Sequence, residues 1–324
     1  MTDSIDNLIE SQDLYRKEVL RMGLVEKTFK NGEVIVKEGD TGNSFFQLVD
    51  GSAYVYAGSG KDDQIKLGVM EAGEYFGEMA ILEAYPRSAS IIAKGTVTAI
   101  EIPKDELNDY LAEDPNRIID LMRHLGNRIQ NMVIDFNESK ALLEQLKASE
   151  AAKQNKNLFS KIKKHIDMYQ NNKNKLSEPS ADSVNSVSEA LSDNGNGKYK
   201  DYRKGMIVFK EGAVDNCMYI LHKGSVGMYI NYRTREEEKV AEYNAVTFFG
   251  EMGIISDEPR GAAAIVESDN TRVEFIGVED LEIIFHDSPE KIIAILRNMS
   301  YRLRKLNVDF LKVCKEITEL YNKK

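Results

Sequence analysis

The sequence contains two copies of a segment in which a glutamate and an arginine stand nine residues apart. The copies are FGEMAILEAYPRSA, with Glu78 and Arg87, and FGEMGIISDEPRGA, with Glu251 and Arg260. An arginine guanidinium is a planar fork that matches phosphate oxygens, while a carboxylate only accepts hydrogen bonds and so suits a sugar hydroxyl. Such a pair can also be a minor surface ion pair. Because the whole spacing is repeated, we instead expect two pockets, each for a phosphate attached to a ribose.

Three short elements must position each pair. The spacing predicts a strand that ends at Phe76 and Gly77, one or two helical turns over EMAIL, and a turn at Pro86 that aims Arg87 back at the start of the helix. The first N–H groups of a helix have no partner within it and attract anions. The predicted layout therefore gathers positive charge at one point.

These segments belong to a longer internal repeat. At an offset of 173 residues, Gly32, Gly39, Gly51 and Gly77 coincide with glycines of the second half, and beyond a loop at 267–270 the offset becomes 174. Two copies of one domain explain this pattern, with one residue gained in that loop.

Each copy begins with short apolar runs that are closed by glycines, such as GEVIVKEGD and GMIVFKEGA. Phe46 and Leu48, and likewise Val226, Met228 and Ile230, keep the period of two that is typical of strands. Short strands at short, regular spacing predict a sandwich or barrel, such as a jelly roll.

Each copy ends in a helical pattern with heptad spacing, which indicates a helix that packs along its length against another helix. The seams are Ile118, Met122, Leu125, Ile129, Met132, Phe136, Ser139, Leu143 and Leu146, and then Ile292, Leu296, Met299, Leu303, Leu306, Phe310, Val313, Ile317 and Leu320. The two helices could pair within one chain, as a pseudo-dimer, or between two chains, as a homodimer.

The connection between the copies has two parts. Residues 151–175 are rich in lysine, and Leu158, Ile162 and Ile166 share a helical face. We expect a solvated continuation of the first long helix there, although a membrane surface, RNA or an acidic partner could also meet it. Residues 176–197 are rich in Ser, Asn and Gly and predict a disordered tether.

The composition and the motifs of the chain exclude several classes of function. The chain has 324 residues and a net charge of -10, which argues against a DNA-binding role for the whole protein. Only Cys217 and Cys314 are present, and no histidine spacing suits a metal, so we expect neither a metal site nor a cofactor. No signal peptide, transmembrane run or catalytic motif is visible, which predicts a cytoplasmic protein that is not an enzyme.

The two segments resemble the phosphate-binding cassettes of cyclic nucleotide-binding domains, which occur in the catabolite activator protein, in regulatory subunits of cAMP-dependent protein kinase and in cyclic-nucleotide-gated channels. The resemblance implies a mainly β fold with helices, in which each eight-stranded jelly roll is followed by a long C-terminal helix. It implies an N-terminal helical segment at 1–20, domains at 21–150 and 199–324, and a linker at 151–198. It also implies the ligand-binding residues Gly77, Glu78, Met79, Ala80, Arg87, Ser88, Ala89, Gly250, Glu251, Met252, Gly253, Arg260, Gly261 and Ala262.

In the resemblance, Glu78 and Glu251 accept the ribose 2'-hydroxyl, Arg87 and Arg260 neutralise the cyclic phosphate, and backbone N–H groups of the cassettes assist. Base contacts from the long helices are assigned to Asn131 and Arg304.

The expected function is a sensor of cyclic AMP or cyclic GMP that signals through its C-terminal helices to an effector that we do not identify. The resemblance implies that Ser88 leaves the base preference of the first site open, while Gly261 favours adenine at the second. The alternative is a structural or interaction protein whose pockets bind nothing or another nucleotide, such as a nucleoside or a cyclic dinucleotide.

Overall fold

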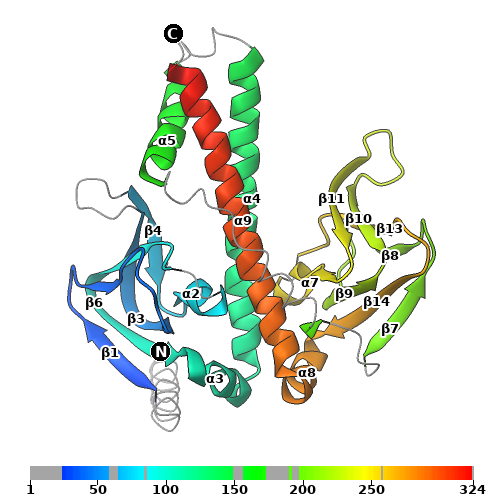
Figure 1. Ribbon diagram of the computed structural model, residues 1–324, viewed down its shortest axis with the longest axis horizontal. Coiled ribbons are helices and arrows are strands. Elements are labelled where there is room, and N and C mark those ends of the chain that lie inside the picture. The colour runs from blue at the N-terminus through cyan, green and yellow to red at the C-terminus, as the bar shows by residue number, and fades with distance from the viewer. Residues whose placement is uncertain are drawn as a thin grey trace, which may run out of the picture. The chain divides into compact units, whose positions relative to one another are not determined.

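The computed structural model describes residues 24–57, 65–83, 86–148, 156–172, 190–191, 197–256 and 258–322. The expected N-terminal segment at 1–20 and most of the expected tether at 176–197 lie outside these residues. The chain forms two compact units, and each unit contains one β-rich lobe (Figure 1).

The first lobe is a six-stranded sheet in the order β1-β6-β3-β4, in which β2 also pairs with β6 and β5 with β3. Its strands are β1 (Val25–Phe29), β2 (Val34–Val36), β3 (Ser44–Ala57), β4 (Ile65–Glu71), β5 (Tyr75–Phe76) and β6 (Ser90–Pro103). The two long strands, β3 and β6, pair along their whole length but shift register twice near Gly51. Such irregularities let one strand bend around a corner of the fold.

The second lobe consists of two four-stranded sheets, in the orders β11-β10-β13-β8 and β12-β9-β14-β7. Its strands are β7 (Lys198–Tyr202), β8 (Ile207–Phe209), β9 (Cys217–Lys223), β10 (Ser225–Ile230), β11 (Glu238–Asn244), β12 (Thr247–Phe249), β13 (Ala263–Val266) and β14 (Thr271–Gly277). Strands β9 and β10 correspond to β3, and β13 and β14 to β6, so the two lobes share one topology.

The cores of the lobes repeat as well. Phe46, Leu48 and Phe76 in the first core coincide with Tyr219, Leu221 and Phe249 in the second. The extra residue expected in the loop at 267–270 lies between β13 and β14. The prediction of a mainly β fold with two tandem domains and additional helices is therefore confirmed.

Helices occur within and after both lobes. They are α2 (Glu78–Glu83), α3 (Leu107–Glu113), α4 (Asn116–Ala148), α5 (Lys156–Asn172), α7 (Met252–Ile255), α8 (Leu281–Asp287) and α9 (Pro289–Asn322), together with the 3-10 turns η1 (Lys104–Glu106) and η4 (Val278–Asp280). Among the described residues, no helix is long and apolar enough to cross a lipid bilayer.

The two long helices divide between the units. The first unit takes α4 from Gln130 onward and α9 from Leu303 onward, and the second unit takes the earlier parts of both. The compact units are therefore not the same divisions of the chain as the sequence repeats. The domain boundaries that the repeat implies stay a prediction.

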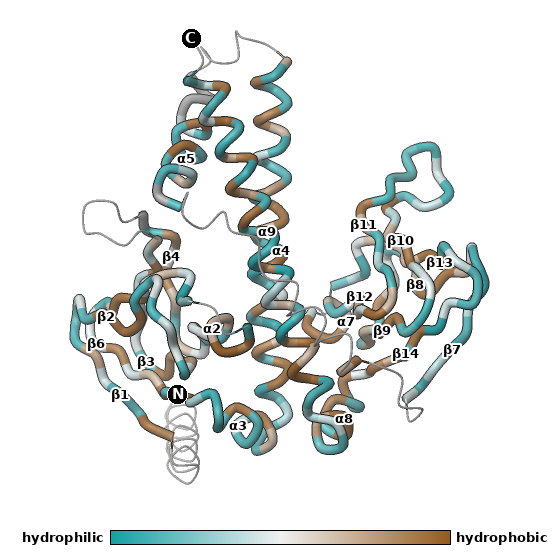
Figure 2. The backbone as a smooth tube through the Cα atoms, viewed as in Figure 1, coloured by the Kyte–Doolittle hydropathy of each residue, from teal (hydrophilic) through white to brown (hydrophobic). Residues whose placement is uncertain are grey.

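The heptad seams are buried along most of both helices, and their apolar residues form the brown stripes of α4 and α9 in Figure 2. Within the first unit, Leu143 and Leu146 of α4 pack with Val313 and Ile317 of α9. Ser139 interrupts the apolar seam, but its hydroxyl is buried and donates to the carbonyl oxygen of Phe136 at 2.7 Å.

Helix α5 differs from the expected solvated helix, because its apolar face is buried. Ile162 is fully buried in the cluster of α4 and α9, and Ile166 packs against the same cluster. Lys163 and Lys164, on the opposite side, are exposed. An apolar stripe and a lysine-rich stripe on one helix thus serve packing and solvation respectively.

Replacing Ile162 by alanine is expected to lower the free energy of unfolding by about 2–5 kcal/mol, because the cavity would be enclosed by three helices. Urea unfolding followed by circular dichroism measures this change. The matched control is Lys163→Ala, which should change stability by less than about 0.5 kcal/mol. Equal effects of the two substitutions would contradict the packing of α5.

Candidate functional site

The first cassette begins where β5 ends and runs through α2 to Arg87. The Nη1 atom of Arg87 donates to the carbonyl oxygen of Gly77 at 2.6 Å, and its Nη2 atom donates to that of Ser44 at 2.5 Å. Glu78 is 1% exposed and Arg87 is 8% exposed. Burial lowers the pKa of Arg87, and the Glu78 carboxylate is the largest opposing influence, so these two charges act on each other. The arginine does fold back onto the start of α2, as the spacing predicts.

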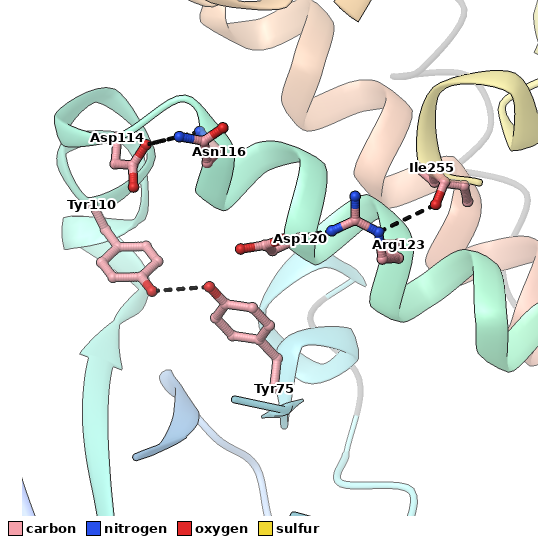
Figure 3. Close-up of polar contacts among 7 residues, drawn as sticks. All are labelled: Tyr75, Tyr110, Asp114, Asn116, Asp120, Arg123 and Ile255. Atoms are coloured by element: carbon pink, nitrogen blue, oxygen red, sulfur yellow. Dashed lines mark hydrogen bonds and ion pairs between the residues drawn. The ribbon is translucent and has the colours of Figure 1, made fainter. Parts of the chain in front are cut away.

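Strand β5, which leads into this cassette, also contacts helix α3. The hydroxyl groups of Tyr75 in β5 and Tyr110 in α3 lie 3.2 Å apart (Figure 3). Tyr110 also donates to Gln47 Oε1 at 2.9 Å. The tyrosine pair ties the start of the cassette to the helix that precedes α4.

The second cassette repeats this arrangement. The Nη1 atom of Arg260 donates to the carbonyl oxygen of Gly250 at 2.5 Å, and its Nη2 atom donates to that of Cys217 at 2.5 Å. Glu251 and Arg260 are 5% and 6% exposed. Arg260 also pairs with Asp215 and lies over the ring of Phe209, 4.4 Å from its centroid.

The glycine before each glutamate is required by the backbone. Gly77 has a φ of 82° and Gly250 a φ of 71°, in the left-handed region that side chains rarely adopt. A Cβ atom at Gly77 would also collide with Arg87. The path into the two cassettes differs slightly, since Gly73 has a φ of 94° and Val246 stands in its place in the second copy.

In the second unit, a residue of α9 contacts the cassette glutamate. Arg302 Nη1 donates to Glu251 Oε1 at 3.0 Å. Burial on its own would lower the pKa of Arg302, but the Glu251 charge and hydrogen bond raise it overall. The carboxylate that the resemblance assigns to a ribose is therefore linked directly to a long helix.

Two more polar contacts join long helices to cassette helices, each within one unit. In the first unit, Arg304 Nε of α9 donates to Glu83 Oε2 at the end of α2, at 3.2 Å. In the second unit, Arg123 Nε of α4 donates to the carbonyl oxygen of Ile255 at the end of α7, also at 3.2 Å (Figure 3). Each long helix thus touches the cassette of the other sequence repeat.

The remaining predicted site residues are distributed as follows. Met79, Ala80 and Gly253 are buried, Met252, Ala89 and Ala262 are partly buried, and Ser88 and Gly261 are exposed. The N–H of Ala80 donates to the carbonyl oxygen of Gly77 at 3.2 Å, and that of Gly253 to the carbonyl oxygen of Gly250 at 3.1 Å. Asn131 is exposed on α4. Arg304 contacts Glu83 of the first cassette, and its assignment to a base stays a prediction.

Sequence reasoning missed Asp215 and Arg302. Arg302 could have been found, because Arg128 occupies the equivalent position of the first repeat at the offset of 174. Asp215 coincides with Gly42 and therefore left no repeated signal. Among the described residues, no group of three His, Cys, Asp or Glu side chains could hold a metal ion.

Comparison with known proteins places these features in a family. The family model described as "Cyclic nucleotide-binding domain" matches residues 26–114 and 199–288, which together make up more than half of the chain. Each match contains one lobe and its cassette. The chain therefore belongs to the cyclic nucleotide-binding domain family and carries two such domains in tandem.

Individual relatives are similar over parts of the chain. A cGMP-dependent protein kinase of Plasmodium berghei (strain Anka) is 42% identical over 106 residues, which is 33% of this chain and 11% of the kinase. A cAMP-dependent protein kinase regulatory subunit of Hypocrea atroviridis is 26% identical over 255 residues, covering 76% of this chain and 43% of the subunit. The chain thus spans less than half the length of these curated relatives.

The solved structure described as "cAMP bound PfPKA-R (141-441)" is also similar. It is 17% identical, with a TM-score of 0.34, over 85% of this chain and 80% of that chain.

Proposed function

We propose that this chain is a cyclic nucleotide sensor that binds cyclic AMP or cyclic GMP in both cassettes and signals through α4 and α9. The observation that carries the proposal is that each lobe buries one glutamate and one arginine at the same short cassette helix. In each lobe the arginine hydrogen-bonds the residue directly before the glutamate. Each cassette thus offers a cation for a phosphate, and a carboxylate as an acceptor for a ribose hydroxyl.

The contact between Glu251 and Arg302 supports a route from ligand to helix. A ribose hydroxyl that donates to Glu251 would share or replace the Arg302 hydrogen bond, which belongs to α9. Ligand binding would then favour one position of the helix over another, which is how a ligand shifts a conformational equilibrium. The proposed role is that of a regulatory module and not of an enzyme.

The proposal extends to the partners of the chain. Packing of α4 and α9 within one unit supports pairing inside one chain over a homodimer. The exposed Ser88 and Gly261 leave room for different base preferences at the two sites. The effector is not identified, and the cytoplasmic location expected from the sequence stays a prediction.

A calorimetric titration tests the proposed function. We expect cyclic AMP or cyclic GMP to bind at two equivalents per chain, and 5'-AMP, which lacks the cyclic phosphate, to bind much more weakly. Cyclic dinucleotides and adenosine complete the panel. If no cyclic mononucleotide gives a heat of binding or raises the melting temperature, the proposal is contradicted.

A second candidate is an interaction protein whose helices carry the function. The cluster of α4, α5 and α9 favours it, because that cluster lies outside both family matches. The same titration separates the two candidates, since an interaction protein with inactive pockets would bind none of the nucleotides.

A further inference from the structure

The two cassette arginines are engaged to different extents. In the second lobe, Arg260 Nε donates to Asp215 Oδ2 at 3.3 Å, and Arg260 Nη2 donates to Asp215 Oδ1. Together with the bonds to the carbonyl oxygens of Cys217 and Gly250, these contacts occupy four of the five N–H groups of the guanidinium. Its side chain is 4% exposed.

In the first lobe, Arg87 makes the two equivalent bonds to carbonyl oxygens, those of Gly77 and Ser44. Within the described residues, no carboxylate is hydrogen-bonded to it. Glu78, Glu101 and Asp40 influence its charge only from a distance. Arg87 therefore keeps three N–H groups that could turn to a phosphate, whereas Arg260 keeps one.

This difference in hydrogen bonding follows from two positions at which the repeats carry different residues. Asp215 replaces Gly42, and Gly253 replaces Ala80. A Cβ atom at Gly42 would collide with the guanidinium of Arg87, and a Cβ atom at Gly253 would collide with that of Arg260. Each lobe thus has a glycine at the place where its own arginine lies. Gly253 leaves the space in which Asp215 holds Arg260.

We propose that Asp215 weakens the hold of the second cassette on a cyclic phosphate, so that the two sites fill at different ligand concentrations. This inference rests on the proposed function. A phosphate that approaches Arg260 must take N–H groups from Asp215, and it must do so beside a carboxylate of its own sign of charge. The guanidinium of Arg87 bonds only to two carbonyl oxygens among the described residues, so a phosphate displaces no carboxylate there. The residue acts on the ligand through Arg260 and is therefore a positioning residue.

The test isolates each site in the whole chain. Arg260→Ala leaves the first site and Arg87→Ala leaves the second, and calorimetry at one fixed ionic strength compares their affinities for cyclic AMP. We expect the first site to bind about tenfold more tightly, the value that one hydrogen bond to a charged group carries. Asp215→Asn in the Arg87→Ala background should tighten the second site by about tenfold.

Asparagine is the informative replacement because its Oδ1 atom can still accept the Cys217 N–H, which bonds to Asp215 Oδ1 at 3.3 Å. A gain in affinity is also a result that general damage to the loop would not give. With Asp215→Glu, the affinity of the second site should stay low, because the negative charge is kept. Asp201→Asn, at an exposed acid on β7, is the matched control and should leave both affinities unchanged.

The outcomes separate this inference from the proposed function. Equal affinities at the two isolated sites, a tighter second site, or a loss of affinity on Asp215→Asn would overturn the inference while leaving the sensor in place. An absence of cyclic nucleotide binding in the wild-type chain would overturn the sensor itself. If Arg87→Ala does not fold, Asp215→Asn in the wild-type chain must narrow the gap between the two fitted affinities, and an unchanged gap counts against the inference.

Discussion

A chain that carries both Arg87→Ala and Arg260→Ala is expected to lose affinity for cyclic AMP at both sites by about a hundredfold or more. Both guanidinium groups are buried, and the cassette helices α2 and α7 contain no basic residue that could replace them. Loss of two charge-assisted hydrogen bonds from a phosphate, at about 1.5 kcal/mol each, corresponds to roughly this factor. Calorimetry measures the affinity of each variant.

Two further variants show whether the loss is specific. Arg203→Ala removes an exposed arginine between β7 and β8 and should bind as the wild-type chain does. Replacement of Arg87 and Arg260 by lysine keeps the charges but not the fork, and should give an intermediate affinity. Thermal unfolding of each variant confirms that the lobes are intact. Wild-type affinity in the double alanine variant would exclude the cassettes as the phosphate sites.

The second large effect concerns the stability of the second lobe. Lys291→Ala is expected to lower the free energy of unfolding by about 3–5 kcal/mol, because it strands a buried carboxylate. Lys291 Nζ lies 2.6 Å from Glu274 Oε1, His222 Nε2 lies 2.7 Å from Glu274 Oε2, and the Glu274 side chain is 2% exposed. Denaturant unfolding of the second lobe measures the effect, with Lys204→Ala at an exposed position as control.

The stability lost in Lys291→Ala should also depend on pH. Burial alone would raise the pKa of Glu274, but hydrogen bonds from His222 and Lys291 hold it below its ordinary value. A carboxyl group with a lowered pKa stabilises the fold fully above its unfolded pKa of about 4.3, and loses this contribution as the pH falls through the folded value. The difference between wild type and Lys291→Ala should therefore be larger at pH 7 than below pH 4. A difference that is constant across this range would show that Glu274 does not depend on Lys291.

Substituting both members of the pair tests the same point from the other side. A chain with Lys291→Met and Glu274→Gln has no stranded charge, so it should recover much of the stability that Lys291→Ala loses. If the double variant is less stable than Lys291→Ala, the cost comes from lost packing and not from an unpaired carboxylate.

Local elements of the site were predictable because short stretches of sequence specify them. The end of β5, the helix over EMAIL and the return of Arg87 to Gly77 all agree with the spacing of the residues. A strand with a period of two, a glycine at a positive φ and a turn proline act over a few residues. The repeat strengthened each assignment, because the second copy shows the same signals.

The burial of the apolar face of helix α5 could not be predicted from such local patterns. Its apolar stripe of Ile162 and Ile166 was visible, but lysines on the other side suggested a helix in solvent. Burial depends on whether another apolar surface is near in space, and the ends of α4 and α9 supply that surface.

Local patterns and the internal repeat were enough to predict the two β-rich lobes and the carboxylate and arginine of each cassette. The partners of those charged groups could not be predicted in this way, because they come from distant parts of the chain. Arg260 and Asp215 are 45 residues apart, Glu251 and Arg302 are 51 apart, and Glu83 and Arg304 are 221 apart. A hydrogen bond forms within about 3 Å in space regardless of distance along the chain, so folding alone brings these groups together.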